Sequence, residues 1–235
     1  MTRKTNSGFS LLELMIVLVL VLVVSAAIYR TISLAIERSV TEQTKLDMFQ
    51  EAREFMDQMA RDLRLAGYPN RHNFAVGVLS TPDTNDHRAA VGLVKIAAGE
   101  LQFEGDVDGS GTVSVIHYLL DSTGTNCPCL KRSHLMKIDA SPMAQTTPVY
   151  EVEVQGVTNT NIFTAYNNGA SVSLPLTFTS NAASIAGLDT IEAKLSLQAA
   201  TIDPKTKTRP VTTLVTTIKI NNCSAAANAQ QTSCN

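Results

Sequence analysis

The stretch LLELMIVLVLVLVVSAAI, from Leu11 to Ile28, decides the architecture of this chain. Only two of its eighteen positions are polar. A helix of this length covers roughly 27 Å, close to the thickness of the hydrocarbon core of a bilayer. The preceding segment, MTRKTNSG (1–8), carries two positive charges and no negative one, which favours a cytoplasmic N-terminus. We therefore expect one membrane-spanning helix that leads the rest of the chain outward.

Two common interpretations of such a run fit it less well. A secretory signal has an apolar core of about 7–15 residues followed by small residues at the cleavage site. Here the run is longer, and the helical pattern continues through the small residues Ser25–Ala27. A plain signal anchor fits the length but leaves Glu13 unexplained, because an ionisable group in a membrane is costly and usually has a function. The simplest alternative is that Glu13 snorkels to the cytoplasmic interface.

The segment GFSLLE (8–13) resembles the processing site of type IV prepilins. The resemblance implies that a prepilin peptidase cuts between Gly8 and Phe9 on the cytoplasmic side of the membrane and that Phe9 is then N-methylated. The new α-amino group has a reference pKa of about 7.7–8.0 and is largely cationic near neutrality. A buried carboxylate is tolerated beside such a cation, so Glu13 would pair with this amine of its own or a neighbouring subunit.

The helical pattern continues beyond the apolar run, without Pro or Gly, as far as Gly67, which precedes Tyr68-Pro69 and is a stop signal. Its second half has apolar residues at spacings of three, four and seven: Leu46, Phe49, Met56, Met59, Leu63 and Ala66. The charged residues between them predict a solvated face with helical ion pairs: Glu51, Arg53, Asp57, Arg61 and Asp62. We expect this half to pack on the chain's own head. A membrane helix joined to an independent second helix is the alternative that the pattern leaves open.

The remainder predicts an α+β fold, in which the long N-terminal helix packs on an antiparallel β-sheet head. Segment 70–90 is expected to be a long loop, and the tail after residue 220 to be weakly structured. Alternating residues predict strands at Ala90–Ala97, Glu100–Glu104, Val113–Leu120, Val149–Val154, Ser171–Phe178, Ile191–Leu197 and Val211–Ile220. The last two would pair through Asp203-Pro204-Lys205 in a single sheet covered by the helix. The expected domains are a leader (1–8), the helix (9–67, membrane-spanning at about 9–29) and the head (68–235).

A second resemblance concerns QEAREFMDQMARDLRLAGYPN, from Gln50 to Asn70. It is similar to minor pilins of the PilW type and, less closely, to the J pseudopilin of type II secretion, through the Arg-Asp-Leu-Arg element and the Ala-Gly-Tyr ending. The segments DVDGSGTVSVIHYLLD and LKRS, within Asp106–Ser133, resemble the middle region of the same family. No resemblance extends beyond about residue 140.

The segment DVDGSGT (106–112) has oxygen-bearing side chains at alternate positions and Gly at the sixth, like the start of a calcium loop. Position twelve of that pattern is His117 rather than Glu, which argues against an EF-hand. A calcium-stabilised turn with Asp106, Asp108 and Ser110 as ligands stays open, but Asp-Gly before an alternating strand favours a plain hairpin. No other cofactor is expected.

Four cysteines, Cys127, Cys129, Cys223 and Cys234, are expected to form disulfides, because the head would face an oxidising compartment. Cys223 with Cys234 is the first choice, and the resemblance to pilins supports such a C-terminal loop. A bond within Cys127-Pro128-Cys129 and cross-pairing of this element with the tail remain open, since sequence alone does not fix connectivity.

Neither an enzyme nor a nucleic-acid-binding protein is indicated. The net charge is −2 with no basic stripe, and the four histidines show no metal spacing. The neighbours Ser133 and His134 would point to opposite faces of a strand.

The resemblance implies a minor type IV pilin that primes or caps pilus assembly, with roles in adhesion or motility. A type II secretion pseudopilin is the alternative, and a membrane-anchored periplasmic binding domain is a more distant one. The implied partners are prepilin peptidase, other pilins, the inner-membrane assembly platform and the bilayer. The chain would sit in the bacterial inner membrane with its head in the periplasm, or in the filament.

Overall fold

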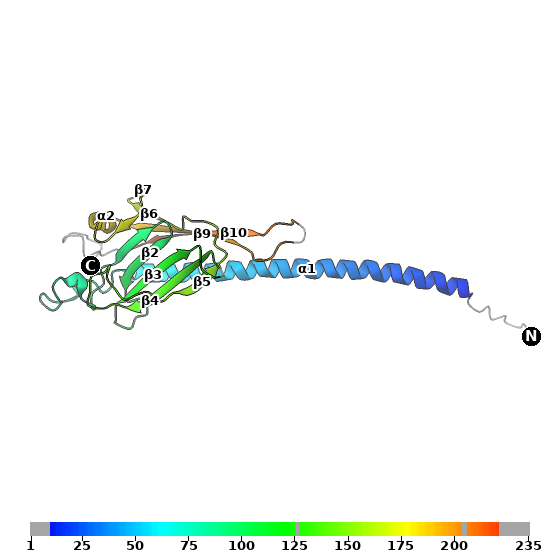
Figure 1. Cartoon of the computed structure of the whole chain (residues 1–235), viewed down its shortest axis with the longest axis horizontal. Coiled ribbons are helices and arrows are strands. Elements are labelled where there is room, and N and C mark those ends of the chain that lie inside the picture. Colours follow the sequence, from blue (N-terminus) through cyan, green and yellow to red (C-terminus); the bar gives the residue numbers. More distant parts are fainter. Residues whose placement is uncertain (1–9, 126, 204–205, 221–235) are drawn as a thin grey trace, which may run out of the picture.

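The structure is a computed structural model that describes residues 10–125, 127–203 and 206–220. One helix, α1 (Leu11–Arg64), runs for 54 residues, and the head gathers around its second half (Figure 1). The carbonyl of Ser10 accepts hydrogen bonds from the amides of Glu13 (3.0 Å) and Leu14 (3.1 Å), so the helix begins where the apolar run begins. It ends at Arg64, two residues before the predicted end. The alternative of two separate helices is therefore wrong.

The end of α1 is fixed on the sheet by a close backbone approach. Ala66 forms an isolated β-bridge with Gly105, and the amide of Gly67 donates to the carbonyl of Glu104 at 2.8 Å. A Cβ atom added to Gly105 would overlap the carbonyl of Leu65. Glycine at position 105 thus lets the strand and the helix end touch through their backbones.

The head contains two antiparallel sheets rather than the single sheet that was expected. In the described residues the first sheet has the order β5-β4-β3-β2-β1-β8 and the second has the order β10-β9-β6-β7. The first consists of β1 (Leu93–Ala97), β2 (Glu100–Gly105), β3 (Ser114–Asp121), β4 (Cys129–Met136), β5 (Glu151–Gln155) and β8 (Leu176–Thr177). The second consists of β6 (Phe163–Asn167), β7 (Ala170–Val172), β9 (Thr190–Gln198) and β10 (Val211–Lys219). The α+β class is confirmed.

Most of the predicted strands lie within three residues of the observed ones, and β9 and β10 pair along their whole length as expected. The predicted strand Ser171–Phe178 is wrong, because β7 and β8 divide it between the two sheets. Strands β4 and β6 and the short helix α2 (Ala182–Ala186) were not predicted. The long loop after residue 70 is confirmed; it holds only the short 3-10 turns η1 (Arg71–Asn73) and η2 (Asp83–Asn85).

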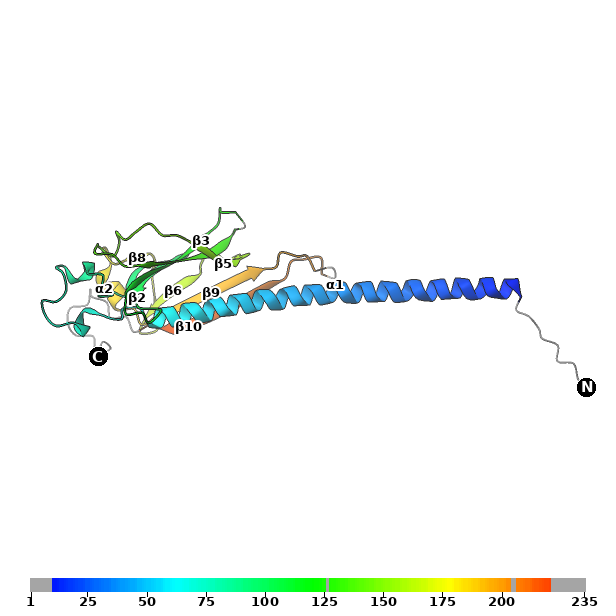
Figure 2. The ribbon, with the colours of Figure 1, turned by 90° about the horizontal axis from the view of Figure 1, so that it is seen from below.

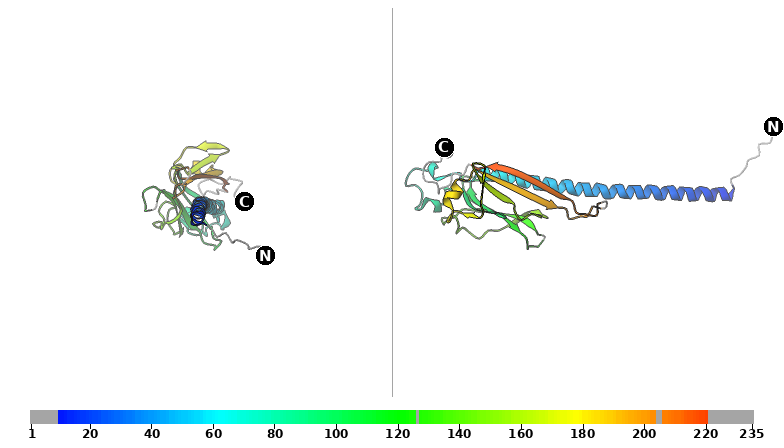
Figure 3. Two further views of the ribbon diagram at one scale, coloured as in Figure 1. Left: turned by 90° about the vertical axis from the view of Figure 1, so that its right-hand side faces the viewer. Right: turned by 90° about the horizontal axis from the view of Figure 1, so that it is seen from above.

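The second half of α1 closes the core between the two sheets. It contacts β5, an edge strand of the first sheet, and β10, an edge strand of the second (Figures 2 and 3). The ring of Phe55 meets the ring of Tyr118 on β3 edge-on, with centroids 5.6 Å apart, and Met59 is fully buried beside them. Each such side chain contributes about 1.5–3 kcal/mol on burial.

The apolar stripe on α1 differs in part from the predicted one. Met56, Met59, Leu63 and Ala66 are buried as expected. Leu46 and Phe49, however, are 60% and 40% exposed. At 3.6 residues per turn they lie about 140° and 80° around the helix from Met59, so Leu46 points away from the head and Phe49 lies at the margin of the buried face. The charged-face prediction is wrong for Asp62, which is only 7% exposed.

Candidate functional site: the apolar helix and its attachment to the head

The first half of α1 is apolar on all sides and exposed on all sides. From Leu11 to Ile36 its large apolar side chains are each at least 48% exposed. In the part of the chain that the structure describes, α1 is the one helix long and apolar enough to cross a membrane, with a mean hydropathy of 3.0 in its best window. A helix that is apolar all round needs lipid or other apolar chains around it.

Glu13 is the acidic residue of the first turn of α1. A negative charge is favoured there, because the unpaired amides of a helix N-terminus carry partial positive charge. The structure thus places Glu13 at the start of the apolar helix. Gly8 and Phe9, the predicted cleavage site, lie outside the described residues.

A buried polar cluster attaches α1 to the first sheet. The carboxylate of Asp62 accepts a hydrogen bond from the hydroxyl of Tyr118 on β3 at 3.0 Å, and forms an ion pair with the guanidinium of Arg132 on β4 at 2.9 Å. Burial raises the pKa of Tyr118 far above its usual range, so its hydroxyl stays protonated and remains a donor. Asp62 belongs to the Arg-Asp-Leu-Arg element. It lies three residues after the buried Met59 and so near the same face of the helix, and this spacing was the signal in the sequence that could have predicted its burial.

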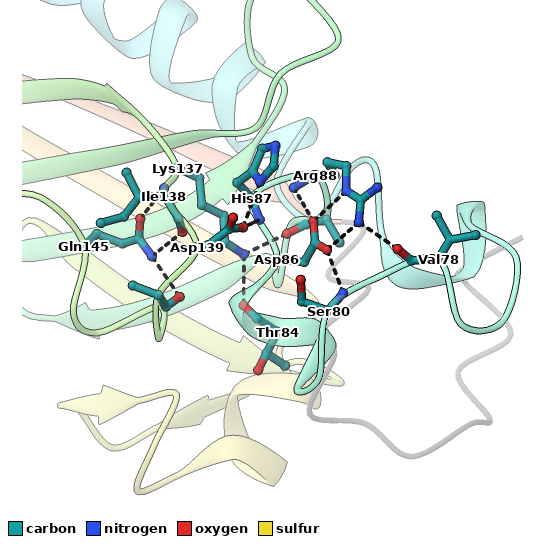
Figure 4. A network of polar contacts seen from close by, with 12 residues as sticks. Val78, Ser80, Thr84, Asp86, His87, Arg88, Lys137, Ile138, Asp139 and Gln145 are labelled. Carbon is teal, nitrogen blue, oxygen red and sulfur yellow. Dashed lines mark hydrogen bonds and ion pairs between the residues drawn. The ribbon is translucent and has the colours of Figure 1, made fainter.

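A second polar network holds the loop between α1 and β1, which lies at the end of the head opposite to the start of α1 (Figures 1 and 4). The side chain of Asp86 is 1% exposed. It accepts hydrogen bonds from the amide of Ser80 at 2.7 Å and from the amide and guanidinium of Arg88 at 2.7–2.9 Å. The Arg88 guanidinium is the main reason that the pKa of Asp86 lies well below its usual range.

Lys137 links the same loop to β2. Its ammonium group is fully buried and donates to the carbonyls of Thr84 (3.0 Å) and Ala89 (2.7 Å) and to the carboxylate of Glu104 (2.7 Å). Burial raises the pKa of Glu104, and the ammonium group opposes that rise. The neighbouring Asp139 accepts hydrogen bonds from the amide and the ring of His87 (Figure 4). The loop is therefore attached by buried charges rather than by apolar packing alone.

The cysteines are placed in part. Cys127 and Cys129 form a disulfide with each other, so the open alternative of cross-pairing between this element and the tail is wrong. Cys223 and Cys234, the first-choice pair, lie outside the described residues. Two clusters of potential metal ligands lie elsewhere: Asp121, Cys127 and Cys129, and Asp86, His87 and Asp139. In the first cluster the two thiols form the disulfide, and in the second the carboxylate of Asp86 is paired with Arg88.

His117 and His134 on the first sheet both have side-chain partners. His117 contacts the carboxylate of Glu100 through Nε2 and the hydroxyl of Tyr150 through Nδ1, both at 2.8 Å, and burial lowers the pKa of His117. His134 contacts the hydroxyl of Ser114 at 2.9 Å. The hydroxyl of Ser133 is buried without a hydrogen-bond partner, so Ser133 and His134 do not form a nucleophile–base pair.

The segment 106–112 is the turn that joins β2 to β3, which pair as antiparallel neighbours. The prediction of a hairpin is confirmed. Gly109 and Gly111 have φ values of +69° and +79°, a region that glycine adopts without strain.

Comparison with known proteins concerns the N-terminal segment alone. The prokaryotic N-terminal methylation motif matches residues 3–29, which include most of the leader, Gly8, Phe9, Glu13 and the apolar run. No curated protein and no solved structure matches the chain. The motif implies contact with a prepilin peptidase and with other pilins, and together with the apolar helix it fits a single-pass, membrane-anchored protein. Such a motif is typical of structural pilin subunits. The methylation motif and the long apolar helix that follows it are the N-terminal features of a type IV pilin-like protein.

Proposed function

We propose that this chain is a minor type IV pilin, a structural subunit that primes or caps pilus assembly. The observation that carries the proposal is the division of α1 (Leu11–Arg64) into two halves. The first half is bare and apolar on all sides, and the second half is locked into a large head through Asp62, Tyr118 and Arg132. Because one continuous helix joins the two halves, a movement of the first half would also move the head. The resemblance of Gln50–Asn70 to the PilW type supports this assignment over a major subunit.

Each segment of the chain has a separate function in this role. The leader (1–8) is removed by prepilin peptidase, and Phe9 becomes the methylated N-terminus. The segment at about 9–29 holds the subunit in the inner membrane until the assembly platform transfers it to the filament. The rest of the helix, to residue 67, carries a periplasmic head (68–235). Glu13 pairs with the new α-amino group, because a carboxylate among apolar helices needs a cation beside it.

The test is to replace Gly8 and Glu13 separately in the producing cell and to follow processing and filaments. Gly8→Val should leave the uncut precursor in the membrane, and Glu13→Ala should be cut but fail to enter filaments. Glu51→Ala, an exposed acid on the second half of the same helix, is the matched control and should behave as the parent does. N-terminal sequencing of the parent should find N-methylated Phe9. Normal cleavage and normal pili with both changes would refute the assembly role.

A pseudopilin of type II secretion is the second candidate, because the same Arg-Asp-Leu-Arg element is found there. Deletion of the gene separates the two roles. If the chain is a minor pilin, the deletion should remove surface pili and leave the secretion of exported enzymes normal. If it is a pseudopilin, the deletion should block secretion and leave surface pili normal. A membrane-anchored binding domain would leave both unchanged.

A further inference from the structure

The turn between β2 and β3 has more acidic oxygen than a hairpin requires. In Asp106–Thr112 the first, third and fifth positions are Asp106, Asp108 and Ser110, and the sixth is Gly111. A two-strand connection of this kind needs glycine or asparagine for positive φ angles but no pair of carboxylates. Asp side chains are common in turns because they accept hydrogen bonds from nearby amides, but the two carboxylates here have more oxygen atoms than those amides use.

Asp106 is the first reason to look for a ligand. The residue is only 7% exposed, and one carboxylate oxygen, Oδ2, accepts a hydrogen bond from the amide of Gly111 at 3.0 Å. The carboxylate is thus turned into the turn itself. Its other oxygen, Oδ1, is buried and has no hydrogen-bond partner. Buried carboxylate oxygens nearly always have a partner, because desolvation without one is costly.

Asp108 brings a second acid to the same place. Its Oδ1 accepts a hydrogen bond from the amide of Ser110 at 3.0 Å. Asp106 and Asp108 thus each turn a carboxylate oxygen toward a backbone amide of the same turn, Gly111 and Ser110 respectively. The hydroxyls of Ser110 and Thr112 are 2.6 Å apart on the same turn. Two carboxyl groups and two hydroxyls thus meet on one short segment.

We propose that this turn binds a calcium ion, with Asp106 through Oδ1, Asp108 and Ser110 as protein ligands and water at the remaining positions. Calcium takes six to eight oxygen ligands in flexible geometry, whereas magnesium requires a near-ideal octahedron. A turn with two positive-φ glycines can adjust to calcium. The twelfth position, which supplies a bidentate Glu in strong sites, is His117, and it is already engaged with Glu100 and Tyr150. The dissociation constant should therefore lie at about 10⁻⁴–10⁻³ M, the range of extracellular modules.

The position of the turn gives the ion a consequence. The amide of Asp106 donates to the carbonyl of Tyr68 at 2.8 Å, directly beside the contact between Gly67 and Glu104 that fixes the end of α1. An ion held by Asp106 would stabilise the junction of the helix and the head. It would do so only outside the cytoplasm, where calcium reaches such concentrations.

The test uses the full-length protein in detergent, stripped with EDTA, and measures its thermal unfolding and the heat of calcium chloride binding. Calcium at ten times its dissociation constant should raise the melting temperature by on the order of 3 °C. Magnesium chloride, and potassium chloride at equal ionic strength, should do less than a third of this.

The decisive variant is Asp108→Asn, because it keeps the size of the side chain and an oxygen for the amide of Ser110. It should weaken calcium binding at least tenfold and remove the thermal shift, and Asp47→Asn, an exposed acid on α1, should retain both. Asp106→Asn should also abolish binding, but Asp108→Asn decides the question if that variant fails to fold. A shift that survives in Asp108→Asn, no shift at about 10 mM calcium, or an equal response to magnesium would each overturn the proposal.

Discussion

Asp62 on α1 and Arg132 on β4 form a 2.9 Å ion pair across 70 residues of sequence, with side chains that are 9% and 13% exposed. Together with Tyr118 they form the polar part of the contact between the helix and the first sheet. The contact holds α1 in one orientation relative to the head, because an ion pair with a hydrogen-bonded neighbour tolerates little sliding.

Replacement of Asp62 by Asn should be strongly destabilising. The change leaves the guanidinium of Arg132 buried without its counter-ion, and breaking a buried pair in this way costs about 3–5 kcal/mol. Urea unfolding of the full-length protein in detergent measures the loss. The matched control is Asp57→Asn on the same helix, whose pair with Arg53 is 3.9 Å long and about two-thirds exposed. It should change stability by less than about 0.5 kcal/mol, and equal losses in the two variants would contradict this role of Asp62.

Replacement of Lys137 by Met should produce a pH-dependent loss of stability. Without the ammonium group, only the amide of Val91 opposes the effect of burial, so the pKa of Glu104 rises further above that of the unfolded chain. A carboxyl group with a raised folded-state pKa loses stabilisation as the pH rises above its unfolded pKa, about 4.3. The difference between parent and variant should therefore be large at pH 7.5 and smaller at pH 5, by thermal unfolding. A double change, Lys137→Met with Glu104→Leu, should remove this pH dependence, and its persistence would assign it to another group.

Asp86 should make the loop after α1 sensitive to acid. Its pKa is lowered in the folded state, chiefly by hydrogen bonds from Arg88, so its stabilisation is present above an unfolded pKa of about 3.9 and is lost as the pH falls below it. Asp86→Asn should speed amide exchange of Ser80 and its neighbours at pH 7, through a loss of about 1.5–3 kcal/mol. Asp83→Asn, which affects a pair with Arg71 about one-third exposed, is the control and should cost less than about 1 kcal/mol. Unchanged exchange in Asp86→Asn would contradict the anchoring role.

The disulfide between Cys127 and Cys129 can be tested by mass spectrometry. Trypsin without reduction should release the peptide Ile96–Lys131 two mass units lighter than its dithiol form, since both cysteines lie between the same two cleavage sites. The C-terminal peptide Ile220–Asn235 should not be joined to it. A cross-linked pair of these peptides would contradict the assignment.

The parts of the fold that could be predicted are those that depend on the pattern of neighbouring residues in the sequence. The apolar run, the stop at Gly67 and the alternation in β9 and β10 are each visible within a short window of sequence. Strand β4 was missed because Lys131, Arg132 and His134 hide its alternation. Their charges have partners on other elements, such as Asp62 on α1, and a window of sequence does not reveal a partner 70 residues away.

The same limit explains the errors on α1. The spacing of Leu46 and Phe49 fits an apolar stripe as well as that of Ala52 and Phe55 does, and only the position of the sheets decides which face is covered. The number of sheets likewise depends on strand pairings between distant segments. The polar network around Lys137 had no local signal, because its partners come from the loop and from β2.

The stretch of α1 between Tyr29 and Thr41 gives the molecule a neck. Thr41 is the first buried residue of the helix, and the predicted membrane segment ends near Tyr29, so about 18 Å of helix lies between head and bilayer. Four large apolar side chains on it are more than half exposed: Ile32, Leu34, Ile36 and Val40. The head leaves them exposed and they lie beyond the predicted membrane segment, and exposed apolar surface of this kind favours contact with other chains. In the proposed filament, neighbouring helices would cover this neck, so its accessibility to a chemical probe would distinguish a free subunit from an assembled one.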